Sequence, residues 1–178
     1  MAIEQIRADH SLVEDRILLL LRTSELEEYK LWLTRRVTLF LLAATEKLIG
    51  NFLSKKFESN TAKAISNFQK DSVKQSTNLN SPYTAGTQFP IGDLPRLAKD
   101  IRCSVIDREA QILIKLDIEF EEQRSIHITL PEKSIRKMCL LIEAISIKAQ
   151  WITAEKITTV DPQDPKNTQC NEVIKKLH

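Results

Sequence analysis

Two short stretches of alternating sequence decide the fold of this chain, residues 16–23 (RILLLLRT) and residues 111–119 (QILIKLDIE). In the second stretch, isoleucine or leucine at every even position alternates with mostly polar residues at the odd positions. Because successive side chains of a strand point to opposite faces of a sheet, this pattern predicts an antiparallel strand with one buried face. In the first stretch, Ile17, Leu19 and Leu21 share one face in the same way.

These strands belong to a unit that occurs twice. Shifting the chain against itself by 95 positions places Ile6 on Ile101 and Leu21 on Leu116, and both copies then predict three strands followed by a helix. Because one such unit alone is too small to bury a full core, we expect the two repeats to associate about a pseudo-twofold axis. The result is an α+β domain, an antiparallel sheet with packed helices. The expected strands cover residues 3–9, 16–23, 29–33, 101–106, 111–119 and 124–128.

Each repeat ends in an expected helix. The first, around residues 37–53 (VTLFLLAATEKLIGNFL), is the most apolar segment of the chain, but two charged residues and an asparagine interrupt it. It therefore predicts a deeply buried helix rather than a membrane span. The second helix covers residues 131–151, with Thr129 as the expected N-cap and Glu132, three residues later, completing a capping box.

A single α+β domain is expected over residues 1–154. Within it, apolar residues at helical spacing predict a further helix over residues 60–74, whereas prolines and glycines predict irregular chain over residues 75–95. After the domain, residues 155–178 form a polar tail that we expect to be mobile. The parts of the domain are repeat 1 (1–53), a connector (54–97) and repeat 2 (98–154).

Composition and spacing exclude several classes of function. Three glycines in 178 residues lie too far apart to form a glycine-rich phosphate loop. Cys103, Cys139 and Cys170, which form no CxxC pair, indicate buried or incidental thiols in a reducing cytosol, and the histidines show no metal-ligand spacing. The charged N-terminus lacks a signal-peptide pattern. We therefore expect a cytoplasmic protein with no membrane partner, no cofactor, no metal and no catalytic residues.

Residues 15–36 (DRILLLLRTSELEEYKLWLTRR) resemble a family of uncharacterised, mostly proteobacterial proteins that carry a block of the type DRLLLR·ST…E·R·WLTRR. The resemblance continues through residues 64–69, 81–83 and 91–95 and closes with residues 149–151. It implies a bacterial origin and assigns no activity. The layout of strands followed by a helix, occurring twice, is also similar to the PUR-type and whirly modules that bind single-stranded nucleic acid.

Arg35 and Arg36 stand at the start of the first expected helix, where the helix dipole disfavours cations. One interpretation is an anion site that combines their guanidiniums with backbone N–H groups of the helix. The other is a structural ion pair with an acid of the preceding turn, residues 24–28, or with an acid of the other copy. We favour the ion pair, because paired charges at the ends of elements are common.

Trp32 and Lys30 lie on the strand face opposite the leucines of that strand, and the neighbouring strand adds Arg16 and Arg22 to the same face. Basic residues around an aromatic ring can form a stacking platform for a nucleic-acid base. Two leucines share this face, however, and they favour packing against the other copy, the connector or a second subunit.

The sequence therefore predicts a non-catalytic binding or assembly module, either a homodimer or a protein with a protein partner. The alternative is a single-stranded nucleic-acid-binding protein, and an enzyme ranks third. Either binding mode would use the same candidate residues: Arg16, Arg22, Lys30, Trp32, Arg35 and Arg36.

Overall fold

The computed structural model describes residues 2–76, 82–108, 111–121 and 124–152, and the expected mobile tail lies outside these residues. The chain has the predicted α+β class, and its elements follow the predicted order of three strands and a helix in each half. The internal repeat and its pseudo-twofold axis stay a prediction. The elements are β1 (Ile3–Ser11), β2 (Arg16–Thr23), β3 (Glu28–Thr34), α1 (Arg35–Lys56), α2 (Ser59–Ser76), β4 (Arg96–Arg108), β5 (Gln111–Phe120), β6 (Ser125–Pro131) and α3 (Glu132–Lys148).

The described strands form one six-stranded sheet in the order β1-β2-β3-β4-β5-β6. Neighbouring strands are antiparallel within each half, but β3 and β4 are parallel, so the expectation of a wholly antiparallel sheet is wrong. Between β3 and β4 the chain passes through α1 and α2, and a strand that re-enters a sheet after a helical crossover can run parallel to the one it left. The two halves are joined there by the pairs Leu31–Arg96 and Trp32–Leu97.

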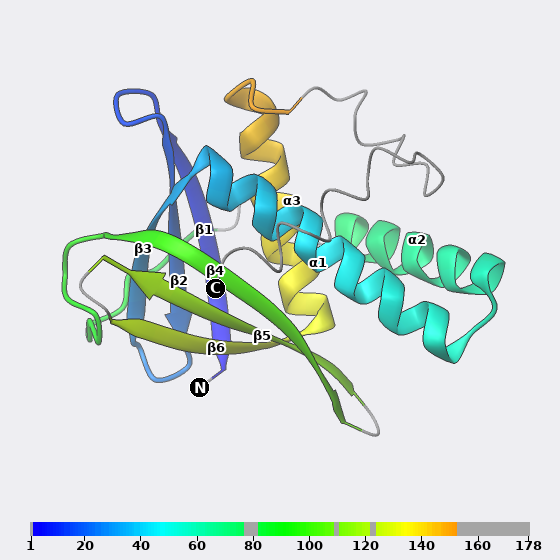
Figure 1. Cartoon of the computed structure of the whole chain (residues 1–178). Coiled ribbons are helices and arrows are strands. Elements are labelled where there is room, and N and C mark those ends of the chain that lie inside the picture. Colours follow the sequence, from blue (N-terminus) through cyan, green and yellow to red (C-terminus); the bar gives the residue numbers. More distant parts are fainter. Residues whose placement is uncertain (1, 77–81, 109–110, 122–123, 153–178) are drawn as a thin grey trace.

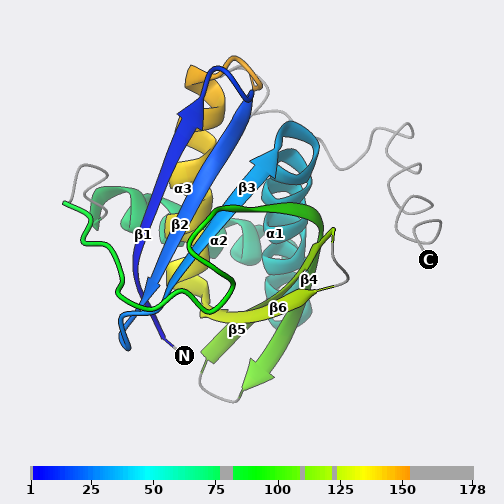
Figure 2. The same cartoon turned by 90° about the vertical axis from the view of Figure 1, so that its left-hand side faces the viewer.

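The helices cover one face of the sheet, and α1 and α3 each contact strands of both halves. Figure 1 and Figure 2 show α1 and α3 against the sheet and α2 on their outer side. In the chain, α1 follows the first half but packs mainly on β4, whereas α3 follows the second half and packs on β1. The helices therefore hold the two halves together from one side.

The core lies between this face and the helices. The alternation expected in both decisive stretches is confirmed, because Ile17, Leu19 and Leu21 are buried in the first and every second residue from Ile114 to Ile118 in the second. Ile112, at the start of the second stretch, is only partly buried. The large apolar strand residues with at most 2% exposure are Ile17, Leu19, Leu21, Leu31, Leu33, Ile101, Ile114, Leu116, Ile118, Ile128 and Leu130. The helices contribute Val37, Leu41, Ile49, Leu53, Ile135, Met138 and Ile142.

Helix α1 is buried on one face only, which corrects the expectation of a deeply buried helix. Val37 and Leu41 are inside, whereas Phe40 is 41% exposed. Thr34 caps the helix, its hydroxyl accepting from the Val37 N–H at 3.4 Å. The helix has the length and the mean hydropathy, 1.3, that membrane-spanning helices have, and core helices meet the same criteria.

Helix α3 begins differently from the prediction. Its N-cap position is Pro131, without a side-chain hydrogen bond, and the expected cap Thr129 lies inside β6 opposite Lys115. Pairing with β5 continues to Pro131 and keeps Thr129 extended. Glu132 does not close a capping box but accepts from Arg136 Nε at 2.9 Å.

Arg136 joins α3 to α2. Its side chain is 4% exposed, and besides Glu132 it donates to Ser66 Oγ and Gln69 Oε1 of α2, both at 3.3 Å. A buried guanidinium requires such partners because removing its charge from water is costly. Arg136 therefore fixes where α2 lies on α3.

Replacing Arg136 tests this role. Arg136→Ala removes the bonds to α2 and leaves the Glu132 carboxylate, whose side chain is 15% exposed, without its partner. We expect a loss of about 3 kcal/mol in the free energy of unfolding, measured by urea denaturation. The control is Arg102→Ala, which removes an exposed pair with Glu119 and should cost less than about 1 kcal/mol. Equal losses in both variants would contradict the structural role of Arg136.

Candidate binding face of the sheet

The face of the sheet opposite the helices differs between the two halves. On β4, β5 and β6 it is polar, with ion pairs between Lys115 and Asp117 at 2.9 Å, His127 and Asp117, and Arg102 and Glu119 at 3.2 Å. Lys115 and His127 together hold the pKa of Asp117 below its usual value. On β1, β2 and β3 the same face carries apolar side chains, so the candidate site lies on the first half.

The apolar side chains of this face come from neighbouring strands. Leu18 on β2 is paired with Trp32 on β3, and Leu20 is paired with Lys30. All four side chains are partly exposed, which confirms the prediction that they point away from the core. No described helix covers them, so we call this surface the open face.

The connector crosses part of the open face. Figure 2 shows residues 82–95 passing in front of the strands, with the helices behind. Tyr83 donates to Glu28 Oε1 at 2.8 Å, and the Thr84 N–H donates to Gln5 Oε1 at 2.9 Å. Irregular chain was expected here, but its docking on the sheet was not, because no pattern in the sequence pairs Tyr83 with Glu28.

Two features, one in the connector and one on β3, explain why the connector lies so close to the sheet. A Cβ atom on Gly86 would lie 2.5 Å from the carbonyl oxygen of Leu26, so only glycine fits this approach. The Glu28 carboxylate is 2% exposed and accepts from Tyr83, with Lys30 Nζ at 3.6 Å. Burial and this carboxylate raise the pKa of the Tyr83 hydroxyl, which therefore stays protonated and can donate.

Between the connector and the strands lies a hollow of about 430 Å³, which we call the groove. Leu18 and Leu20 form its apolar floor, and the connector supplies one wall. Two bases and two acids line it as well, so its charges balance. The complete lining is Arg7, Leu18, Leu20, Glu28, Lys30, Tyr83, Ala85, Asp93 and Pro95.

Three of the predicted basic residues lie on the open face, and each has an acidic partner. Arg16 pairs with Glu14 at 3.3 Å, and Lys30 pairs with Glu28 and lies 4.4 Å from the centre of the Phe89 ring. Arg22, whose side chain is 10% exposed, pairs with Glu4 at 2.6 Å; this bond crosses from β2 to β1.

The other two predicted arginines lie at the joint between the halves and bind backbone rather than the turn glutamates. Arg35 donates to the carbonyl oxygen of Trp151 at 3.2 Å, and Arg36 donates to that of Lys99 at 2.8 Å. Both bonds connect the start of α1 to the second half of the chain. The six predicted residues are therefore spread over two locations and do not converge on one ligand.

A polar cluster that the sequence did not indicate fixes the end of α3. Asp15 accepts from Trp151 Nε1 at 2.9 Å, and His10 Nε2 lies 3.4 Å from the same oxygen. The bond from Trp151 is the main reason that the pKa of Asp15 lies below its usual value. Because Arg35 holds the Trp151 carbonyl, this cluster joins the β1–β2 turn, α1 and α3.

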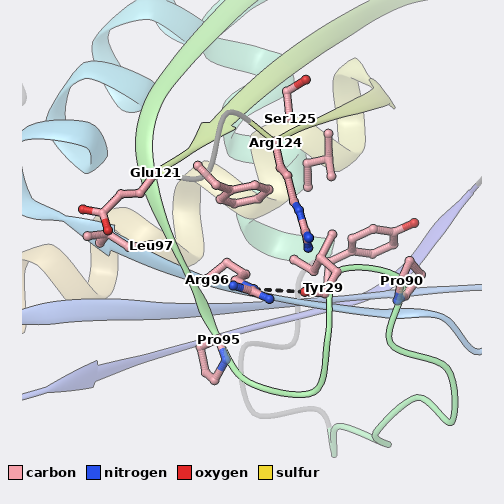
Figure 3. A pocket seen from close by; sticks show the side chains of 11 residues that line it. Tyr29, Pro90, Pro95, Arg96, Leu97, Glu121, Arg124 and Ser125 are labelled. Atoms are coloured by element: carbon pink, nitrogen blue, oxygen red, sulfur yellow. Dashed lines mark hydrogen bonds between the residues drawn. The ribbon is translucent and has the colours of Figure 1, made fainter.

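A second hollow, of about 520 Å³, lies where the two halves of the sheet meet. Figure 3 shows Arg96 and Arg124 directed into it.

Among the described residues there is no group of three metal-ligating side chains. The absence of a metal site stays a prediction from the sequence. The described cysteines, Cys103 and Cys139, are free thiols, and burial raises the pKa of each to about 12.

The fold and this face define a two-layer α+β protein with a grooved sheet face. No protein-family model, curated protein or solved structure matches the chain. The resemblance to the proteobacterial family therefore stays a prediction from the sequence.

Replacing Tyr83 tests whether its hydrogen bond docks the connector. Tyr83→Phe removes the hydroxyl that satisfies the buried Glu28 carboxylate, and we expect a loss of about 2 kcal/mol in the free energy of unfolding. Amide hydrogen exchange of residues 82–95 should become faster. Thr84→Ala is the control, because the bond of Thr84 to Gln5 comes from the backbone N–H. Unchanged exchange in Tyr83→Phe would show that the connector is held by other contacts.

Proposed function

We propose that this chain is a non-catalytic assembly module that binds a second copy of itself through the open face. The observation that carries the proposal is the groove, which combines an apolar floor with balanced charges on the one sheet face that no described helix covers. Apolar surface that is left at a sheet face and bordered by polar groups is typical of a protein-binding site.

The charge of the groove favours a copy of this chain as the partner. Arg7 and Lys30 stand against Glu28 and Asp93 in its lining. In a symmetric dimer the same patch meets itself, so a patch of one charge sign would repel its copy. A patch with both signs can place each base near an acid of the other copy.

The connector also provides a side chain that suits such an interface. Leu94 is 72% exposed and stands between two residues that line the groove, Asp93 and Pro95. Phe89, also on the connector, is 37% exposed. An exposed apolar side chain beside an apolar hollow is the arrangement that a symmetric interface needs, because each copy can insert Leu94 into the groove of the other.

The alternative, binding of single-stranded nucleic acid, has less support from the arrangement of charges. Affinity for a phosphate backbone depends on lysines and arginines that replace its counterions. Arg16, Arg22 and Lys30 each face a carboxylate of this chain, which lowers the positive potential of the open face. A bacterial origin, a cytoplasmic location and the lack of catalytic activity stay predictions from the sequence.

Light scattering coupled to size-exclusion chromatography tests the proposal. We expect wild-type protein to have twice the chain mass of 20.4 kDa. Leu94→Asp should raise the dimer dissociation constant at least about tenfold, because a buried leucine contributes roughly 2 kcal/mol and a buried carboxylate opposes association.

Leu12→Asp is the matched control. Leu12 is 86% exposed at the turn between β1 and β2 and does not line the groove, so this variant should dimerise like wild type. A wild-type mass of 20.4 kDa at every concentration, or equal weakening by both substitutions, would contradict the proposal. Salt-sensitive binding of a single-stranded oligonucleotide by a monomer, lost in Lys30→Gln, would favour the alternative.

A further inference from the structure

Helix α2 is attached less firmly than the other two described helices. Of its 18 residues only Ala62 and Val73 are buried, whereas α1 and α3 have six buried residues each. Its largest apolar side chain, Phe68, is 75% exposed. Because burial of apolar surface is the main contribution that holds a helix on a protein, α2 is the helix that we expect to detach first.

Helix α2 rests on a surface that α1 and α3 form together. Figure 1 shows it on the outer side of these helices, away from the sheet. Lys70 of α2 pairs with Glu46 of α1 at 3.8 Å, and Arg136 of α3 donates to α2 from the other side. We call this surface of α1 and α3, which includes Glu46 and Arg136, the cradle.

The inner face of α2 shows which kind of helix the cradle accepts. Ala62 and Val73 are buried and Ile65 is partly buried, and Gln69, which contacts Arg136, lies between them in the sequence. These residues follow one another at steps of three or four, so they share one face of the helix. Binding of an amphipathic helix in a groove uses anchors at the same spacing.

Arg136 gives the cradle a preference for charge. Its side chain is 4% exposed, and its Nε donates to the Glu132 carboxylate at 2.9 Å. The two bonds from its Nη2 to α2 go to neutral oxygens, those of Ser66 and Gln69, both at 3.3 Å. Hydrogen bonds from a guanidinium to a carboxylate are shorter and stronger than those to a neutral oxygen. A helix that carries a carboxylate in place of Gln69 would therefore bind Arg136 better than α2 does.

The link between α1 and α2 allows α2 to move without α1. It consists of Phe57 and Glu58, and Phe57 has an extended backbone, with φ −134° and ψ 156°. A change of backbone angles at a few residues at the end of an element is enough for a hinge. Such a change at this link would move α2 away from the cradle.

We propose that the cradle binds an amphipathic helix of a partner protein, and that α2 occupies it as a displaceable lid. The partner helix has small apolar residues on one face and a carboxylate opposite Arg136. The cradle lies on the helical side of the sheet, opposite the open face, so the proposal does not depend on the dimer.

Amide hydrogen exchange of the wild-type chain tests whether α2 opens by itself. We expect residues 59–76 to exchange at least about tenfold faster than residues 132–148, because opening of α2 leaves the other helices on the sheet. Exchange of α2 as slow as that of α3 would overturn the proposal. This measurement needs no variant.

Binding of a fluorescein-labelled peptide with the sequence of residues 58–76, followed by fluorescence anisotropy, tests the cradle. Ala62→Asp places a carboxylate at a buried position of α2 and leaves the cradle unchanged. This chain should bind the peptide at least about tenfold more tightly than wild type, in which α2 competes for the site.

Ala64→Asp is the matched control, because it makes the same change two residues further along α2 at an exposed position. It should bind the peptide like wild type, and circular dichroism verifies that both variants are folded. Equal binding by wild type, Ala62→Asp and Ala64→Asp would overturn the proposal.

Substitutions in the peptide test the role of Arg136. A Gln69→Glu peptide should bind the Ala62→Asp chain about tenfold more tightly than the unchanged peptide, because it brings a carboxylate to the guanidinium. An Asn67→Glu peptide adds the same charge at a position that is exposed in α2, and it should show no gain. The same affinity for both substituted peptides would overturn the preference for a carboxylate.

Oligomeric state separates this proposal from the dimer. Leu94→Asp should bind the peptide like wild type, so a failure of the dimer proposal does not affect the result. Loss of a dimer in Ala62→Asp but not in Leu94→Asp would assign the cradle to α2 of a second copy, and would overturn the assignment to a partner protein.

Discussion

The structure depends on a joint that the strands alone hold weakly. In the described chain, β3 and β4 share two residue pairs, whereas the antiparallel neighbours within each half pair along most of their length. The apolar face that runs across both halves must therefore be buried by elements that contact both of them. Helices α1 and α3 do this, because each packs on the first strand of the other half, so burial of apolar surface rather than sheet hydrogen bonding unites the domain.

Both hollows are consequences of this joint. Because the halves meet over so short a length, they diverge beside it, and the space is bordered by side chains of both halves, Arg96 and Arg124 among them. To reach β4 from α2, the chain also has to return across the open face. The bond from Tyr83 to Glu28 holds it there, and Gly86 permits its close approach to the sheet. The groove is the space between this crossing and β2.

The charged residues show how tertiary contacts change the meaning of a sequence pattern. Arg35 and Arg36 look misplaced at a helix start. In the structure they donate to backbone carbonyls of the second half, and these bonds explain their position without an anion or a turn glutamate. Arg22 looked like part of a basic surface, yet its partner Glu4 lies on the neighbouring strand. Such partners come from strand register and packing, which residue types alone do not specify.

The sequence by itself determined the α+β class, the order of the elements and the buried faces of β2, β3 and β5, because alternation along a strand and helical spacing are local properties of the chain. It also placed Trp32 and Lys30 on the face away from the core. Only the tertiary structure decided that β4 runs parallel to β3, that Tyr83 of the connector meets Glu28, and that Arg96 and Arg124 face one hollow. These contacts join residues far apart in the chain, and they depend on how the two halves meet, which no local pattern encodes.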